Sequence, residues 1–371
     1  MVEVKINMHR NTVYGHPEWK KHKSSWRHMR HIFNIFSSGV IAALGPPVIL
    51  STLGAVFVSM INFGVRNKRF LSWVPLVEIA IEPFQLLSPV LALLLVFRTN
   101  ASYQRFDEAR KVWGSNVNRC RDLARQSLTW ITVPDDKEKR QWILRYIKAY
   151  PYFLKHHLTQ GASVADELLG ILSQEELDAV CSAPNRPIYV LQIISEMINS
   201  CRLAEFERIT MDTNLTQFHD NVGACERIFK TPIPVAYTRL TSRVLMLWHL
   251  ALPYGLWETC GWLTIPATFM SAAALFYIEQ VGVIIEEPFY ILALDSICGG
   301  ITTAIDGLSA AHEEAMVMVW GVAMRKAKHG LPKQEHLVVN LDHHKPTAPG
   351  RSLSKGDMNI IFQRSPKPLD Q

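Results

Sequence analysis

One stretch of the sequence, residues 88–113, changes from apolar to basic without a break. Its first half, up to Phe97, is almost entirely apolar, whereas its second half contains Arg98, Arg105 and Lys111. No glycine or proline lies at the border between the two halves to end a helix. The pattern therefore predicts a single helix that leaves lipid at about Phe97 and continues into water.

Two pairs of apolar stretches flank a long polar section. The first pair consists of 32–65, which contains no Asp, Glu, Lys or Arg, and 70–97, which contains only two glutamates. Pro46 and Pro47 interrupt the first stretch, so its membrane helix should begin near Gly39 or bend at the prolines.

The second pair, 234–257 and 259–285, is joined by a short polar turn at 258–261. Each of the four stretches is long enough for a membrane helix, which needs about 20 residues to cross a bilayer. We therefore predict four transmembrane helices. An even number of spans puts both termini, and the section between the two pairs, on the same side of the membrane.

The section between the pairs, 98–230, is polar in character and helical in pattern. Apolar side chains recur at helical spacing in 138–158 and again in 188–206. Nothing alternates with a period of two over a length that would predict a sheet. These features predict an all-α membrane protein with a helical extramembrane domain.

The two ends of the chain have compositions of their own. The N-terminal segment carries basic residues between aromatic side chains, which fits an interfacial helix on an anionic membrane surface or a solvated lead-in that fixes topology. From Leu331 the chain contains five prolines and no helical periodicity, which predicts an extended tail. The predicted organisation is a basic segment (1–38), a first transmembrane hairpin (39–97), a soluble helical domain (98–230), a second hairpin (231–285), further helices of the soluble domain (286–330) and the tail (331–371).

The composition supports a membrane protein and excludes several other classes. Hydrophobic residues make up 48% of the 371 residues and charged residues only 19%, below the roughly 25% typical of soluble proteins. A net charge of +6 is too small to indicate a nucleic-acid partner. The six cysteines form no CxxC pair, so neither a metal site nor a disulfide framework is expected. The sequence lacks GxSxG, P-loop and GxGxxG motifs, which argues against an enzyme.

Three motifs give the sequence a resemblance to a known family. They are FRTNASYQRFDEARKVWG (97–114), PIPVAYTRL (232–240) and EEPF (286–289). In this order they resemble the bestrophin family of anion channels, in its bacterial and plant branch, from about Trp26 to Lys328. The resemblance implies a bestrophin-like homopentamer of four-span subunits in the lipid bilayer that conducts chloride and other small anions. The plant members imply the thylakoid membrane of the chloroplast, with the soluble domain and both termini on the stromal side.

The resemblance also implies which residues line the pore. In the family the second span surrounds a narrow neck on the fivefold axis, and its neck positions correspond here to Phe97, Leu93 and Pro89. Spacings of four place the three residues on one helix face. A large apolar side chain is usual at the position of Pro89, so the proline predicts a wider or bent end of the neck. Without the resemblance, Leu93 and Phe97 would be interpreted as residues that pack against neighbouring spans.

Beyond the neck, the resemblance implies a wide vestibule with a positive potential. Between residues 98 and 125 there are seven Lys or Arg against three Asp or Glu, and such a field raises the local concentration of chloride. For Arg110 and Glu108 an intrasubunit ion pair is the preferred interpretation. The candidate vestibule residues are Arg98, Arg105, Arg119, Arg125 and Arg186.

A second constriction, or aperture, lies in the family at a residue that follows a proline. Pro187-Ile188 matches this pattern, so Ile188 is the candidate aperture residue. Its alternative role is the first core residue of a helix that starts at the proline.

Animal members of the family hold calcium in an acidic run after the last span. In this chain residues 290–293 are Tyr-Ile-Leu-Ala, and only Asp295 is acidic. Calcium takes six to eight oxygen ligands. We therefore expect no calcium site, and no cofactor of any kind.

The function that the resemblance implies, and that the neck pattern favours, is a chloride channel, expected from the plant members to depend on voltage and to balance charge across the thylakoid membrane. An ion-coupled anion transporter remains an alternative, although the sequence has no internal repeat of the kind that transporters usually contain. A non-conducting membrane scaffold is the second alternative.

Overall fold

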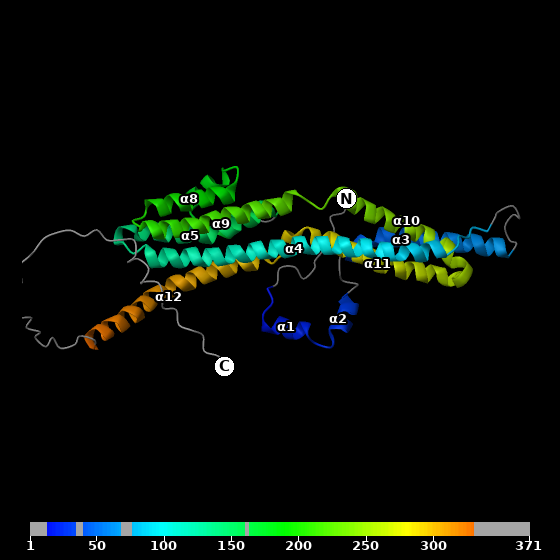
Figure 1. Ribbon diagram of the computed structural model, residues 1–371, viewed down its shortest axis with the longest axis horizontal. Helices are drawn as coiled ribbons and strands as arrows, with labels where there is room; N and C mark the ends of the chain where they lie inside the picture. Colours follow the sequence, from blue (N-terminus) through cyan, green and yellow to red (C-terminus); the bar gives the residue numbers. More distant parts are fainter. Residues whose placement is uncertain (1–12, 35–39, 68–75, 160–162, 330–371) are drawn as a thin grey trace, which may run out of the picture. The chain divides into compact units, whose positions relative to one another are not determined.

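The computed structural model describes residues 13–34, 40–67, 76–159 and 163–329, and every regular element in these ranges is helical (Figure 1). This confirms the predicted all-α class. The predicted tail at 331–371 lies outside the described residues. The helices of four or more residues are α1 (His16–His22), α2 (Arg27–Asn34), α3 (Val40–Arg66), α4 (Glu82–Trp130), α5 (Lys137–Leu158), α6 (Val164–Leu168), α7 (Gln174–Cys181), α8 (Arg186–Ser200), α9 (Glu205–Lys230), α10 (Val235–Cys260), α11 (Thr264–Glu286) and α12 (Leu294–His329).

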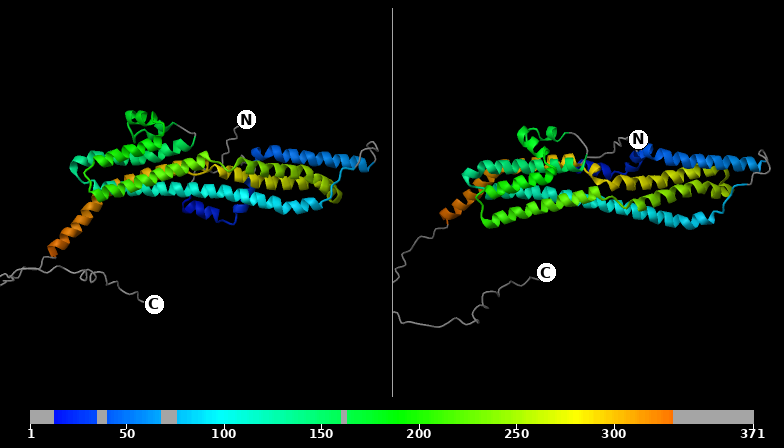
Figure 2. Two further views of the ribbon diagram at one scale, coloured as in Figure 1. Left: turned by 45° about the horizontal axis from the view of Figure 1, so that its top comes forward. Right: turned by 90° about the horizontal axis from the view of Figure 1, so that it is seen from above.

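The helices α3, α10 and α11 and the first part of α4 pack side by side as a membrane bundle (Figure 2). Within the described chain, the stretches long and apolar enough to cross a bilayer are 44–66, a part of 82–130 and a part of 205–286, the range that contains α10 and α11. The protein is therefore a helical membrane protein, and the number of four spans stays a prediction.

One continuous helix, α4, belongs both to the membrane bundle and to the helices outside it. It has 49 residues, so at 1.5 Å per residue it is roughly 70 Å long, more than twice the ~30 Å thickness of a bilayer's hydrocarbon core. This matches the predicted helix that crosses from lipid into water. Residues 76–81 are not helical, so the helix begins later in the stretch predicted from Phe70. Pro83 stands in the first turn, where the missing N–H of proline costs no hydrogen bond.

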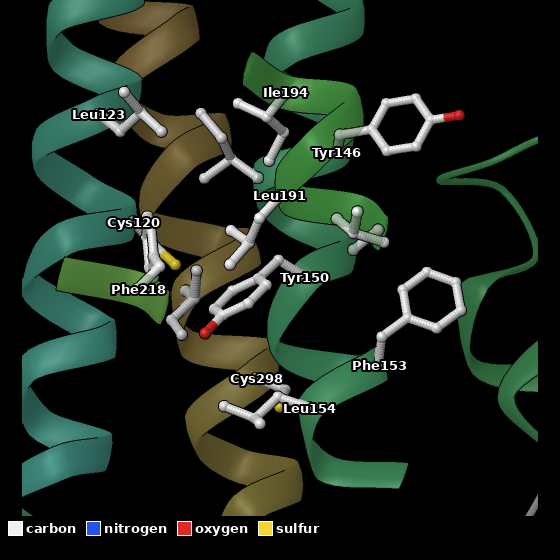
Figure 3. Close-up of a cluster of buried hydrophobic side chains, with 14 of the residues drawn as sticks. Cys120, Leu123, Tyr146, Tyr150, Phe153, Leu154, Leu191, Ile194, Phe218 and Cys298 are labelled. Atoms are coloured by element: carbon white, nitrogen blue, oxygen red, sulfur yellow. The ribbon is translucent and has the colours of Figure 1, made fainter. Parts of the chain in front are cut away.

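The second half of α4 packs with α5, α8, α9 and the start of α12 around a large apolar core, and we call these helices the extramembrane bundle. Figure 3 shows its centre, where Cys120 of α4, Tyr150 of α5, Phe218 of α9 and Cys298 of α12 approach one another. The six cysteines are free thiols, as the sequence predicts. The helix predicted for 188–206 is divided, because α8 ends at Ser200 and α9 begins at Glu205.

The turn of the second hairpin forms slightly later than the predicted 258–261, because residues 258–260 belong to α10. The helix α10 ends at Cys260, and Gly261 has a φ of +53°, which glycine adopts at little cost because it has no Cβ. A short 3₁₀ turn follows, and α11 begins at Thr264. At its other end the hairpin is separated from α9 by Pro232 and Pro234, which are not part of either helix.

Candidate functional site

The membrane half of α4 has a buried face and an exposed apolar face. Leu91 and Leu95 are each 3% exposed and pack in the membrane bundle, whereas Leu93 and Phe97 are 52% and 55% exposed. Pro89 is also exposed. The three residues predicted for the neck therefore share the face that no part of the described chain covers. An apolar surface of this kind is covered by lipid or by another subunit, or it lines a dry pore.

The exposed face continues along the whole of α4. Residues at intervals of seven from Phe97 are all exposed, and they change from apolar to polar: Val90, Phe97, Gln104, Lys111, Asn118 and Arg125. A repeat of seven keeps to one slowly drifting face of a helix. The predicted neck and part of the predicted vestibule thus belong to a single surface, which we call the α4 outer face.

Arg98, a predicted vestibule residue, points away from the α4 outer face. It is 3% exposed, and its Nη1 donates to Oε1 of Glu279 on α11 in a buried ion pair. Arg98 therefore links two helices of the membrane bundle and offers no free guanidinium to an ion. Glu279 was missed in the sequence, although it is the first charged residue after the charge-free run 259–278.

Arg105, also predicted for the vestibule, is used as a clamp between helix ends. It donates to the carbonyl oxygens of Ile228 at 2.6 Å, Thr231 at 2.6 Å and Glu286 at 3.1 Å. These carbonyls lie at or beside the C-terminal ends of α9 and α11, where the helix dipole favours a cation. Arg105 thus ties α4 to the two points, after α9 and after α11, where the chain passes between the membrane bundle and the other helices.

Arg119 contacts α9 through an amide network. Its Nη1 donates to Oδ1 of Asn214 at 2.9 Å, and Nδ2 of Asn214 donates to Gln126 at 2.8 Å and Asp122 at 3.2 Å. Arg125 is exposed and lies 2.7 Å from Asp122. Arg119 is therefore mainly structural, whereas Arg125 presents its charge on the α4 outer face beside the carboxylate of Asp122.

Arg110 and Glu108 each form an intrasubunit ion pair, as the sequence predicts, although not with each other. Arg110 instead binds Asp107 at 2.8 Å, and Glu108 accepts from Arg227 of α9 at 2.5 Å. The reason is geometric: residues three apart on a helix are neighbours, whereas residues two apart point in different directions.

An exposed cation that the prediction omitted, Arg121, lies next to this surface. Together with Asn118 and Arg125 it lines an open depression between α4 and α12. Its spacing of four from Arg125 is the sequence signal that could have identified it.

The candidate aperture residue, Ile188, is 39% exposed in the first turn of α8. Its backbone N–H donates to Oδ1 of Asn185, which caps the helix, and Nδ2 of Asn185 donates to Glu226 of α9 at 3.1 Å. The neighbouring Arg186 is half-buried. Exposure of Ile188 disfavours its alternative role as a core residue, because the residues buried at the start of this helix are Pro187 and Val190.

The segment that follows α11 holds its acidic residue in an ion pair. Asp295 accepts from Nζ of Lys155 at 2.7 Å, and the same ammonium binds Glu167. Burial acts to lower the pKa of Lys155, but the hydrogen bonds to Asp295 and Glu167 outweigh it, and the pKa is raised. Among the described residues, no group of three or more His, Cys, Asp or Glu is placed to hold a metal ion.

The chain is similar to proteins of known family. The model of the bacterial and fungal bestrophin protein family matches residues 18–306. Voltage-dependent chloride channel 1, chloroplastic, from Arabidopsis thaliana is 42% identical over 78% of this chain and 71% of its own length, and channel 2 is 41% identical over 80% and 73%. A crystal structure of a bacterial bestrophin homologue from Klebsiella pneumoniae matches the fold with a TM-score of 0.63, at 24% identity over 71% of this chain and 97% of that one.

The family match covers more than half of the chain, and the motifs that suggested it, FRTNASYQRFDEARKVWG and PIPVAYTRL, lie inside the matched range. The family is not a class of enzymes, in agreement with the sequence prediction. The solved relative shares the arrangement of long helices. This protein therefore belongs to the bestrophin family.

Proposed function

We propose that this protein is an anion channel that conducts chloride and depends on voltage. The observation that carries the proposal is the α4 outer face, which is apolar up to Phe97 and basic beyond it on one uninterrupted helix. Two relatives at about 40% identity are named voltage-dependent chloride channels, which supports the same conclusion.

The apolar part of the α4 outer face acts as the neck, with rings of Pro89, Leu93 and Phe97. A narrow ring of apolar side chains excludes water, so an ion inside it loses hydration and the pore is closed until the ring widens. The edge of a phenyl ring carries a partial positive charge, and a ring of Phe97 edges therefore tolerates an anion better than a cation.

The basic part of the same face acts as the vestibule wall. Lys111 and Arg125 are exposed there, Arg121 is exposed next to it, and Arg186 stands beside the aperture residue Ile188. The exposed cations raise the concentration of chloride near the neck. The roles first considered for Arg98, Arg105 and Arg119 become structural, because their guanidinium groups are engaged with other helices.

The assembly we propose is a homopentamer with the α4 outer faces around its axis. A single helix cannot enclose a pore, so several copies are needed, and closed cyclic symmetry supplies them. Mass photometry in mild detergent tests this: five copies are expected, and a monomer or a twofold dimer contradicts the pore assignment.

The channel is proposed to work without calcium. The carboxylate of Asp295, in the segment that would have to supply calcium ligands, is already neutralised by the ammonium of Lys155. Channel activity should be the same in chelator and in saturating calcium, and a steep calcium dependence contradicts the proposal.

The location we propose is the thylakoid membrane, with the extramembrane bundle on the stromal side. Both plant relatives are named as chloroplastic, and the long apolar helices fit a membrane protein of the chloroplast. Protease added to the stromal face of intact thylakoids should cleave in the extramembrane bundle, and protection there reverses the orientation.

Recording from purified protein in planar bilayers under a chloride gradient tests the function. Unitary currents that reverse at the chloride equilibrium potential are expected for a channel. Slow, saturable flux that depends on a second ion indicates the coupled transporter, and the absence of both current and flux indicates the scaffold.

A further inference from the structure

The buried ion pair between Arg98 and Glu279 lies directly behind the proposed neck. Arg98 follows Phe97 in the chain, and consecutive residues of a helix point about 100° apart. Phe97 therefore faces outward from the bundle while Arg98 faces α11. Any rotation of α4 that moves the phenyl ring must also move the guanidinium.

The surroundings of the pair are built to accept the arginine side chain. Gly282, three residues after Glu279 on α11, lies against it: a Cβ at this glycine would stand 3.7 Å from Nε of Arg98 and 3.9 Å from Oγ of Ser102. A methyl group would be tolerated at that distance, but a longer side chain would displace the guanidinium. The small residue thus leaves the space that the ion pair occupies.

The pair is a costly way to hold two membrane helices together. Removing two charges from water carries a penalty of several kcal/mol per ion, which the attraction between them offsets only partly, and apolar residues of similar size often pack as well. Apart from this pair and the hydrogen bond from Arg105 to the carbonyl oxygen of Glu286, these helices meet through apolar side chains, Leu91 and Leu95 of α4 and Ala272 and Phe276 of α11. Such apolar surfaces define the rotation of a helix weakly, whereas a buried ion pair accepts one arrangement.

We propose that Arg98 and Glu279 are positioning residues for the gate: their ion pair fixes the rotation of α4 and so holds Leu93 and Phe97 toward the pore. This inference rests on the proposed channel function. The pair sets which face of α4 lines the neck without touching the permeating ion.

The experiment measures the rotation of α4 by cysteine modification. Leu93→Cys and Leu95→Cys are introduced separately, and each protein is reconstituted in bilayers. While the channel is held open by voltage, so that water enters the neck, it is treated with a charged methanethiosulfonate reagent that reacts only with thiols reached by water. The chain without an added cysteine gives the background of the six native thiols. Leu93→Cys should react many-fold faster than Leu95→Cys, because Leu93 is exposed and Leu95 is buried.

The same two cysteines are then placed in the double variant R98M/E279M, which removes the pair without leaving a buried charge alone. The ratio of the two rates should fall several-fold, and the currents should lose their rectification while the protein remains an oligomer of unchanged size. An unchanged ratio with unchanged rectification overturns the inference. Arg98→Lys keeps the charge and should retain most of the ratio, which a purely space-filling role for the side chain would not predict.

A second pair of variants tests the inference through α11 alone. Gly282→Leu should lower the ratio as R98M/E279M does, because the longer side chain displaces the guanidinium, whereas Gly282→Ala should leave it unchanged. Equal ratios in these two variants contradict the inference. Failure of the channel proposal is seen separately, as an absence of anion current from the unmodified chain.

Discussion

The exposed faces of the two halves of α4 differ in composition, whereas their buried faces pack in the same way. In both halves the buried face packs against other helices of the same chain, through Leu91 and Leu95 in the membrane and through Trp113 and Leu123 outside it. The exposed face is apolar in the first half and polar in the second. The composition of the outer face therefore reflects the surroundings of the helix. The composition of the inner face reflects the helices that pack against it.

The two bundles also differ in how large their cores are. The core outside the membrane includes four of the largest fully buried side chains, Trp113, Tyr150, Phe153 and Phe218, whereas the membrane core is small and centred on Leu245 and Phe276. In water the burial of apolar surface drives packing, but in lipid it does not, because lipid tails are as apolar as leucine. Specific polar contacts such as Arg98–Glu279 therefore have a larger part in determining how the helices of the membrane bundle are arranged.

The largest expected effect tests the outer face of the first half. Leu93→Ala or Phe97→Ala changes one ring of five side chains at once, so the barrier to hydrating the neck should fall sharply, and currents should become several-fold larger or leaky with less rectification. Leu95→Ala is the matched control, because it removes the same atoms from the buried face. It should cost about 2–5 kcal/mol of stability and leave conduction per channel unchanged. Single-channel recording and thermal unfolding measure the two effects, and a pore opened by Leu95→Ala but not by Leu93→Ala would place the neck on the other face.

The comparison explains how much of the molecule the sequence could predict. The continuity of α4 across the border at Phe97 followed from the absence of glycine and proline between Pro89 and Gly114, and its change of surroundings followed from the change of composition. The start of the helix was predicted too early, because an apolar run that includes 76–81 does not by itself distinguish a helix from an extended segment.

The partners of the arginines could not be predicted in the same way. Arg98 and Glu279 are 181 residues apart in the chain, and so are Arg105 and Glu286. Local spacing carries no information about such contacts, because they depend on how the two hairpins pack. Residues 98–125 do carry an excess of positive charge, but some of these cationic side chains are buried against other helices. Only the exposed cations can act on an ion.

The next effect tests the outer face of the second half. Arg121→Gln should lower anion flux a few-fold at low ionic strength, because it removes an exposed charge beside the proposed vestibule. The effect should fade as salt is raised, since the screening length is about 10 Å at 0.1 M. Lys137→Gln, which removes an exposed charge from α5 instead, is the matched control and should leave flux unchanged at every salt concentration. A loss of flux that is equal in the two variants, or independent of salt, contradicts the electrostatic role.

A smaller effect is expected at the aperture. Ile188→Ala shortens an exposed side chain without removing the cap that Asn185 provides, so the fold should be retained. The ratio of chloride to nitrate permeability should shift, while the gating produced by Leu93 and Phe97 stays the same. Reversal potentials in mixed anion solutions measure the shift. A changed gate with unchanged selectivity would assign Ile188 to the coupling between bundles and not to the pore.

The smallest effect concerns stability of the extramembrane bundle in acid. Asp136 is buried before α5, where Oδ2 accepts from the backbone N–H of Arg202 at 2.8 Å and Oδ1 binds Lys139 at 2.9 Å. The hydrogen bond from Arg202, followed by that from Lys139, lowers the pKa of Asp136 below its ordinary value of 3.8.

A carboxyl group with a lowered pKa stabilises the fold above its unfolded pKa, and this contribution is lost as the pH falls through the folded pKa. Asp136→Asn should therefore lower the Tm of the purified protein at pH 7, and the difference from the unmodified chain should shrink once the pH falls below 3.8. Asp135→Asn is the matched control, because Asp135 is exposed and pairs with Arg202 at the surface. It should change the Tm little at any pH, since an exposed ion pair contributes at most about 1 kcal/mol. A Tm difference for Asp136→Asn that persists unchanged in acid would mean that the amide disturbs packing, and that the charge of Asp136 does not stabilise the bundle.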